Sequence, residues 1–423
     1  MKVLSAHELR KLNFMTNRHL PYSRQNIDQD DIDAVVEALK SRFLTTGPEI
    51  SAFESELAEY VGAKYAVVCS SGTAGLHLAM MCTGIQVGQK VLTSPITFVA
   101  DANVARYVGA DVVLSDVSSS TVNICPKASR SVLLSDPSIK VLVPVHFAGQ
   151  PYDVNGFSSL LQDFDVSVVE DACHALGAEY QDVDGKWRKV GSCHSSLMTV
   201  FSFHPVKTMT TGEGGCITTN DKAIYQELKK LRSHGVSNDP ETFQSITRGF
   251  TEIDGDRVQN PWYYEMQSLG FNYRITDFQC ALGRAQLKKI DQNITRRHEL
   301  TVIYREALHR RLGDLVRPLH CGLGIKHAHH LFVVRIPFER LSGGRAGLMN
   351  SLLAKGIHTQ VHYMPIQHHP YYQNLIKPID DTPNANQYYG ECLSLPLFAQ
   401  MEESDVFWVV DTLDRLISAS IKR

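Results

Sequence analysis

A lysine follows an apolar segment and precedes a turn rich in threonine and glycine, in FSFHPVKTMTTGEGG (residues 201–215). In this segment, Lys207 could reach a ligand bound at the strand ends of an α/β sheet, where such sheets bind ligands. Burial lowers the pKa of a lysine and makes it a competent nucleophile for Schiff-base formation. An ordinary surface lysine would also fit the segment, so Lys207 indicates this chemistry only together with other groups.

A pair of carboxylates ends another apolar segment, VSVVEDACHALG (residues 166–177). Asp171 would lie at the ligand edge of the sheet, and His174 follows three residues later. A carboxylate in that place could hold a proton on a pyridine nitrogen and keep the ring electron-poor. It could equally cap the helix that follows, and His174 could be a structural histidine.

A third segment, CSSGTAGLHLAM (residues 69–80), joins a strand to a helix through a turn that contains glycine. Backbone N–H groups and the helix dipole make such a turn an anion site, although an ordinary strand–helix turn looks the same. The chain has neither GxGxxG nor GxxxxGK[ST], so a Rossmann or Walker phosphate loop is not supported.

Histidines and cysteines could suggest a metal site. His146 and the pairs at 329–330 and 368–369 have no acidic or cysteine partner at ligand spacing, and the nine cysteines form no CxxC pair. We therefore predict no metal site and no disulfide framework, and a reducing, cytoplasmic setting is the simplest.

Alternating helical and strand-like segments must position these groups. The strand-like segments are apolar and rich in valine, which is typical of a mostly parallel sheet with helices on both faces. They are residues 65–70, 90–95, 111–117, 140–147, 166–171, 197–203 and 215–220. Helical segments are expected at 31–41, 51–61, 74–82 and 101–109, with Ser51 and Glu54 as a capping box for the second.

The second half of the chain has a different pattern. Residues 221–308 read as helix-rich and polar, and residues 329–337, 346–356 and 357–365, closed by a helix at 405–417, indicate a smaller α+β domain. We predict an N-terminal extension (1–20), a large domain (21–290) and a small C-terminal domain (291–423).

Length and composition are those of a soluble globular protein. The chain has 423 residues, 43% hydrophobic and 21% charged, with a formal net charge of −3. Nothing in this balance calls for nucleic acid or an anionic membrane, and no stretch approaches the ~20 apolar residues of a membrane helix.

Taken together and in this order, the segments SSGTA, TSPITFVADAN, PVHFAGQP, EDACHALG and FSFHPVKTMTTGEGG resemble the DegT/DnrJ/EryC1/StrS family of sugar aminotransferases. The resemblance runs from about residue 22 to the C-terminus. It implies the PLP-dependent transferase fold (aspartate aminotransferase-like, type I) and pyridoxal 5′-phosphate (PLP) as cofactor. Within the family, the chain is most similar to the branch that acts at C4 in pseudaminic acid synthesis. The segments that carry this similarity are PYSRQNID, FLTTGPEISAFE, LRSHGV, PWYYEMQSLGFNYRITDFQCALG and VHYMPIQ.

The resemblance also implies a role for individual residues. Lys207 would bind the cofactor covalently and then move protons, Asp171 would pair with the pyridine nitrogen, and His174 would lie near the phenolic oxygen. The remaining cofactor contacts would be ring stacking by Phe98 and phosphate binding by Gly72, Thr73, Ser202 and, from the neighbouring subunit, Asn272. Arg274 would meet an anionic group of the donor or sugar nucleotide, and Thr46, Gly47 and Tyr363 would line the sugar side.

The implied reaction moves an amino group from L-glutamate, which leaves as 2-oxoglutarate, to C4 of a UDP-linked 4-keto-6-deoxy-N-acetylhexosamine. A site shared across a two-fold interface would make a homodimer the minimum unit. The alternatives are a C-4 aminotransferase for a perosamine- or bacillosamine-type precursor and a catalytically silent binding partner. A dehydratase relative is a further alternative, but in such relatives a histidine replaces the lysine.

Overall fold

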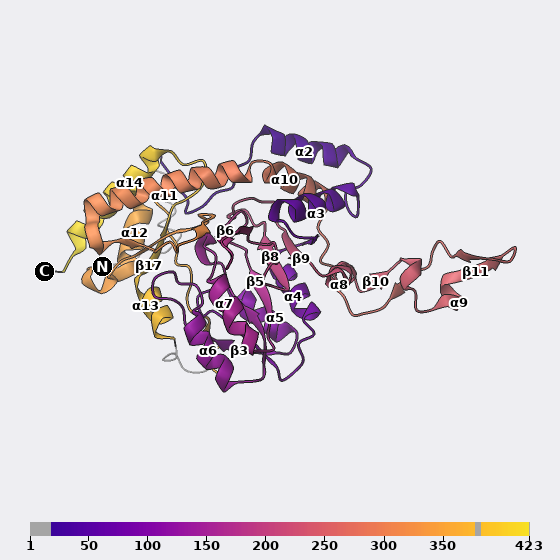
Figure 1. The fold of residues 1–423 in the computed structure, drawn as a ribbon. Coiled ribbons are helices and arrows are strands. Elements are labelled where there is room, and N and C mark those ends of the chain that lie inside the picture. Colours follow the sequence, from indigo (N-terminus) through magenta and orange to yellow (C-terminus); the bar gives the residue numbers. More distant parts are fainter. Residues whose placement is uncertain (1–17, 377–381, 423) are drawn as a thin grey trace.

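A seven-stranded sheet forms the centre of the protein in the computed structural model, which describes residues 18–376 and 382–422 (Figure 1). The strand order is β1-β9-β8-β5-β4-β2-β3. The five strands from β8 to β3 run parallel, and β9 is antiparallel to both of its neighbours. The prediction of a mostly parallel central sheet is therefore confirmed.

All seven apolar segments predicted as strands are in this sheet. Its strands are β1 (Tyr65–Cys69), β2 (Lys90–Thr93), β3 (Asp111–Leu114), β4 (Ile139–Val143), β5 (Ser167–Asp171), β8 (Met198–Ser202) and β9 (Gly215–Thr219). The helices around it are α2 (Gln29–Lys40), α3 (Pro48–Val61), α4 (Gly72–Cys82), α5 (Ala100–Tyr107), α6 (Pro126–Ser135), α7 (Val154–Leu160), α8 (Lys222–Arg232) and α10 (Asp277–Leu287).

Both faces of the sheet are covered, because successive residues of its strands enter different cores. Ala66 and Val68 of β1 pack in a core with α3, α6, α7 and α10, whereas Val67 and Cys69 pack in a second core with α4, α5 and α8. Burial on both faces explains why these strands read as continuous apolar runs.

A separate core lies in the C-terminal part of the chain. It packs α11 (Ile290–Leu312), α12 (Gly344–Ala354) and α14 (Glu403–Ser420) against an antiparallel sheet of β14 (Arg317–Pro318), β16 (Phe332–Arg335) and β17 (Cys392–Leu395). Leu20 also belongs to this core. Residues 1–17 of the predicted extension lie outside the described residues, and the division near residue 290 stays a prediction. A small sheet joins the two parts of the chain: β15 (Ile325–Lys326) pairs with β6 (Glu179–Gln181), which pairs with β7 (Trp187–Lys189). Helix α13 (Pro383–Glu391) precedes β17.

An arm extends away from the rest of the chain between α8 and α10 (Figure 1). It contains β10 (Val236–Ser237), α9 (Ile246–Gly249), β11 (Phe250–Ile253), β12 (Asp256–Gln259) and β13 (Glu265–Met266). The prediction of a helix-rich segment over 221–308 is therefore wrong for the arm. Several of its large apolar side chains are exposed, among them Trp262, Tyr264, Met266 and Leu269.

The predicted capping box of Ser51 and Glu54 is also wrong, because α3 begins earlier, at Pro48. Proline is favoured at the first position of a helix, where its missing N–H costs nothing. The Asp277 carboxylate caps this helix instead and accepts the N–H groups of Gly47 (2.9 Å) and Glu49 (3.1 Å). Glu54 turns inward and pairs with Arg232 (2.6 Å).

Residues 357–365, expected to contribute to the α+β domain as an apolar segment, form no strand. Isolated bridges attach Ile357 to Leu20 and Gln360 to Ser394. Among the helices of the described residues, none has both the length and the apolar character needed to cross a bilayer.

Candidate active site

A cavity of about 620 Å³ opens at the carboxyl ends of the parallel strands. This is the edge at which open α/β sheets bind ligands. The loops after β1, β2, β5 and β8 line the cavity on one side, and residues 360–364 line it on the other. Eight residues singled out in the sequence line it together: Gly72, Thr73, Phe98, Asp171, His174, Ser202, Lys207 and Tyr363.

Lys207 lies in the loop between the antiparallel strands β8 and β9. Its N–H donates to the carbonyl of His204 (2.9 Å), and the hydroxyl of Thr210 donates to the carbonyl of Phe203 (2.9 Å), so the loop is held by local hydrogen bonds. Burial lowers the pKa of Lys207, and the nearby Cys173, Asp171 and Asp101 oppose this effect. A buried lysine with a lowered pKa is the form that can act as a nucleophile.

Asp171 is the last residue of β5, and 6% of it is exposed. Its backbone is fixed by two hydrogen bonds, from its N–H to the carbonyl of Pro144 (2.9 Å) and from the His146 N–H to its own carbonyl (3.0 Å). Its Oδ1 accepts the Cys173 N–H (2.9 Å). The carboxylate is therefore held in one orientation beside the cavity.

His174 and Tyr363 are brought together from distant parts of the chain. The Tyr363 hydroxyl and His174 Nε2 are 3.1 Å apart, and the two rings are stacked with an interplanar angle of 20°. Burial, together with the charges of Lys207 and His362, holds the pKa of His174 well below its usual range. His174 is therefore neutral near pH 7, with one ring nitrogen able to accept a hydrogen bond.

The first turn of α4 lies close to Ser202 at the end of β8. The Ser71 hydroxyl caps α4 by accepting the Ala74 N–H (3.1 Å). A Cβ atom at Gly72 would lie 2.8 Å from the Ser202 Cβ and 3.1 Å from the Cys173 sulfur, so this approach requires glycine. The free N–H groups of the helix N-terminus and the Ser202 hydroxyl can bind an anion such as a phosphate.

The aromatic residue Phe98 stands at the mouth of the cavity, and 56% of it is exposed. Its ring centroid is 6.2 Å from that of Tyr363. A flat ligand could therefore contact the Phe98 ring without displacing core residues.

Four predicted site residues do not line this cavity: Thr46, Gly47, Asn272 and Arg274. They lie on two segments joined by the bridge between Thr45 and Thr276 and by the capping contact of Gly47 with Asp277. Thr46 and Asn272 are exposed. Within one chain, none of the four lines the cavity, although Tyr273, between Asn272 and Arg274, accepts the N–H of Ser70 beside it (2.9 Å).

Sequence reasoning missed several residues in or beside the cavity. His330 and His362 line it, and burial lowers the pKa of both. Asp101 lies behind it, 1% exposed, with the Thr97 hydroxyl donating to its Oδ2 (2.5 Å). No local signal in the sequence singles out Asp101, because its helical segment also contains the polar residues Asn103 and Arg106.

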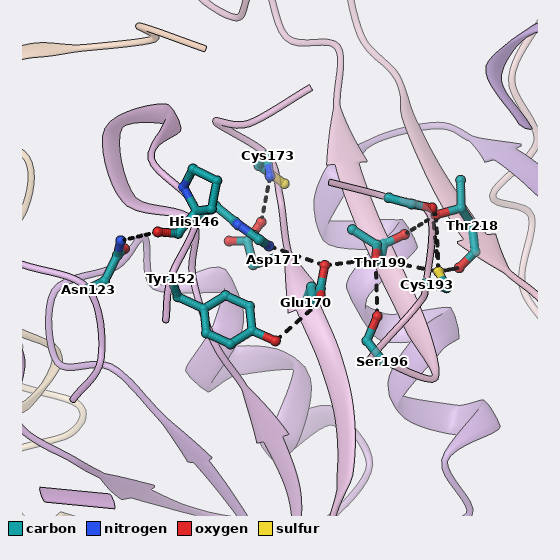
Figure 2. A network of polar contacts seen from close by, with 12 residues as sticks. Asn123, His146, Tyr152, Glu170, Asp171, Cys173, Cys193, Ser196, Thr199 and Thr218 are labelled. Carbon is teal, nitrogen blue, oxygen red and sulfur yellow. Dashed lines mark hydrogen bonds and ion pairs between the residues drawn. The ribbon is translucent and has the colours of Figure 1, made fainter. Parts of the chain in front are cut away.

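A network of buried polar groups lies next to Asp171, around Glu170 (Figure 2). Glu170 Oε2 accepts the Thr199 hydroxyl (3.0 Å) and lies 3.2 Å from His146 Nε2. Its Oε1 accepts the Tyr152 hydroxyl (3.3 Å). Both carboxylate oxygens of Glu170 therefore have partners within the protein, whereas the neighbouring Asp171 faces the cavity.

The residues of the cavity fit PLP. A nucleophilic lysine, a fixed carboxylate and a helix N-terminus suited to a phosphate converge on one space, as this cofactor requires for its aldehyde, pyridine nitrogen and phosphate. With the mostly parallel sheet, they define a PLP-dependent aminotransferase.

The comparison with family models gives the family. Residues 25–414 match the model of the DegT/DnrJ/EryC1/StrS aminotransferase family, and the chain belongs to this family. The resemblance seen in the sequence is thus confirmed.

Two relatives are equally similar in sequence. The UDP-4-amino-4,6-dideoxy-N-acetyl-beta-L-altrosamine transaminase of Campylobacter jejuni (strain 81-176) is 36% identical over 395 residues, 93% of this chain and 96% of that protein. The spore coat polysaccharide biosynthesis protein SpsC of Bacillus subtilis is 36% identical over 406 residues, 96% and 98% of the two chains.

Among solved structures, Helicobacter pylori PseC, an aminotransferase involved in the biosynthesis of pseudoaminic acid, superposes with a TM-score of 0.83 at 29% identity. The match covers 95% of this chain and 100% of that one.

Proposed function

We propose that this aminotransferase transfers the amino group of L-glutamate to C4 of a UDP-linked 4-keto-6-deoxy-N-acetylhexosamine. The observation that carries the proposal is the single cavity in which Lys207, Asp171 and the N-terminus of α4 converge. The C. jejuni and H. pylori relatives, by their names, point to the substrate.

PLP, when bound, supplies an electron-poor ring that stabilises negative charge at the α-carbon of the amino acid. Lys207 would hold the cofactor through its aldehyde, and its lowered pKa favours the neutral amine that this requires. The same amine would move the proton between the α-carbon of glutamate and C4′ of the cofactor. With the keto sugar bound, Lys207 would move the proton in the opposite direction.

Other residues bind and orient. Asp171 holds the proton on the pyridine nitrogen, since its carboxylate is fixed by the Cys173 N–H. The phosphate is bound by Gly72, Thr73 and Ser202. Neutral His174, with Tyr363 beside it, offers a hydrogen bond to the phenolic oxygen. Phe98 covers one face of the ring.

We further propose a homodimer in which each site is completed by the other subunit. Asn272 and Arg274, with Thr46 and Gly47, do not line the cavity of their own chain, and in the proposed dimer these residues would reach the cavity of the other subunit. The exposed apolar side chains of the arm, such as Trp262 and Leu269, support such contact, because large apolar patches mark interaction sites. Unpaired cysteines throughout fit the proposed cytoplasmic setting.

A second substrate class remains a candidate because the B. subtilis relative, named for spore coat polysaccharide, is as similar as the C. jejuni one. That class comprises other nucleotide-linked 4-keto sugars, of the perosamine or bacillosamine type.

The test follows the visible absorption of the PLP-loaded protein. L-glutamate should abolish the band of the bound cofactor, and the UDP-linked keto sugar should restore it. Lys207→Ala should not form the wild-type band, although its fold should be retained by circular dichroism. A wild-type protein that forms no band with PLP would disprove the proposal. If only another nucleotide-linked keto sugar restored the band, that sugar would be assigned as the substrate instead.

A further inference from the structure

Asp101 is a buried carboxyl group that the proposed mechanism does not use. It lies in the first turn of α5 and is 1% exposed. Its Oδ2 accepts the Thr97 hydroxyl (2.5 Å), and the Asp171 carboxyl group is close enough for its charge to act on Asp101. Oδ1 of Asp101 is buried and receives no N–H or O–H donor from the described residues.

Two adjacent buried carboxyl groups cannot both ionise at low cost, because like charges in a poorly solvated place disfavour each other. Burial is the main cause that raises the pKa of Asp101 well above its usual range, and the negative charge of Asp171 is the second cause. The Thr97 hydroxyl and the charge of Lys207 act in the opposite direction. Asp171 already accepts the Cys173 N–H, so it is the better placed of the two to keep a negative charge.

A proton on Asp101 also resolves the unsatisfied oxygen. A protonated carboxyl group has an O–H that can donate, and the Asp171 carboxylate is an acceptor beside it. A hydrogen bond to a charged acceptor is stronger than a neutral one.

We propose that Asp101 is a positioning residue that stays protonated and donates a hydrogen bond to Asp171. This rests on the proposed role of Asp171 toward the cofactor. The pair then carries a single negative charge, and Asp171 is held from two sides, by Asp101 and by the Cys173 N–H. The carboxylate is thereby prevented from rotating away from the pyridine nitrogen.

The first test uses the cofactor-free protein and measures the infrared C=O stretch of protonated carboxyl groups near pH 7. The wild type should show such a band, and Asp101→Asn should lose it. Asp116→Asn is the matched control, because this buried carboxylate accepts backbone N–H groups from Val117, Asn384 and Ala385 and should not contribute to the band. A wild type without the band, or a band that Asp101→Asn leaves unchanged, would overturn the proposal.

The second test compares Asp101→Asn with Asp101→Ala in the loaded enzyme. The amide of asparagine can still donate to Asp171 and accept from Thr97, so kcat and the cofactor absorption band should stay near wild type. Alanine removes the donor, so kcat should fall on the order of tenfold or more with KM for glutamate little changed. Asparagine as damaging as alanine would refute the hydrogen bond, and circular dichroism identifies a variant that does not fold.

The two tests separate this proposal from the proposed function. If the wild type binds no PLP, the proposed function fails, while the infrared band still decides whether Asp101 is protonated. If PLP binds and reacts but the band is absent, the Asp101 proposal alone fails.

Discussion

Glu170 and Asp171 are neighbours on β5, and the structure uses them in opposite ways (Figure 2). Successive residues of a strand point to opposite faces of the sheet. The Glu170 carboxylate therefore enters the packed side, and the Asp171 carboxylate, at the end of the strand, faces the cavity. Glu170 is surrounded by His146, Tyr152 and Thr199, whereas Asp171 keeps acceptor capacity toward the cavity. A buried carboxylate with all of its partners stabilises the fold, and one with a partner missing is available to a ligand.

The largest expected effect is on activity, at Asp171. Asp171→Asn keeps the size of the side chain but loses the charge that holds the pyridine proton, so we expect kcat to fall on the order of 100-fold or more. The melting temperature without cofactor should change little. Steady-state kinetics and circular dichroism measure the two quantities, and an Asp171→Asn variant as fast as wild type would contradict the assigned role.

Glu170 should show the reverse pattern. Glu170→Gln cannot accept hydrogen bonds at both side-chain positions, so we expect the free energy of unfolding to fall by about 1–3 kcal/mol. The folded fraction should remain active within a few-fold of wild type. Urea unfolding gives the stability. A variant that is fully stable but inactive would show that Glu170 belongs to the site.

Acid should weaken the protein through the histidines at the cavity. Burial, helped by the charge of Lys207, lowers the pKa of His362 to about 3, so the unfolded chain binds a proton first as the pH falls. The stability contributed by neutral His362 is fully present above about pH 6.5 and is lost below it, by up to about 1.4 kcal/mol per pH unit. His362→Gln should give a shallower loss between pH 6.5 and 5 in urea unfolding. An unchanged slope would argue against a buried neutral histidine.

The smallest effect is expected at Tyr152, at the edge of the Glu170 network. Tyr152→Phe removes one long hydrogen bond to Glu170 (3.3 Å) and should cost about 1 kcal/mol of unfolding free energy. Combined with Glu170→Gln, the two losses should be less than additive, because both remove the same contact. Full additivity in this double-mutant cycle would indicate that the 3.3 Å contact contributes little.

The sheet and much of the site could be predicted from the sequence because both depend on local patterns. Apolar runs mark the strands, and Lys207 and Asp171 directly follow or end such runs. The features that the sequence did not predict depend on contacts between distant residues. Asp277 caps α3 from more than 200 positions away in the sequence. Nothing in the sequence around Ser51 and Glu54 therefore indicated that these two residues do not form the cap.

The arm and Asp101 were missed for related reasons. The elements of the arm (residues 236–269) are short, and many of their large apolar side chains are exposed, so no apolar period in the sequence identifies these elements. Asp101 differs from a surface residue of α5 only through the position of Asp171, which comes from another strand.

The antiparallel pairing of β8 with β9 also determines which contacts place Lys207. β8 and β9 are joined by the loop of residues 203–214, which holds Lys207, so the lysine is placed by contacts of low sequence separation. Asp171 and the N-terminus of α4 arrive through pairings between segments far apart in the chain. A chain whose sheet is incomplete should therefore be unable to retain the cofactor, whether or not its lysine loop has formed.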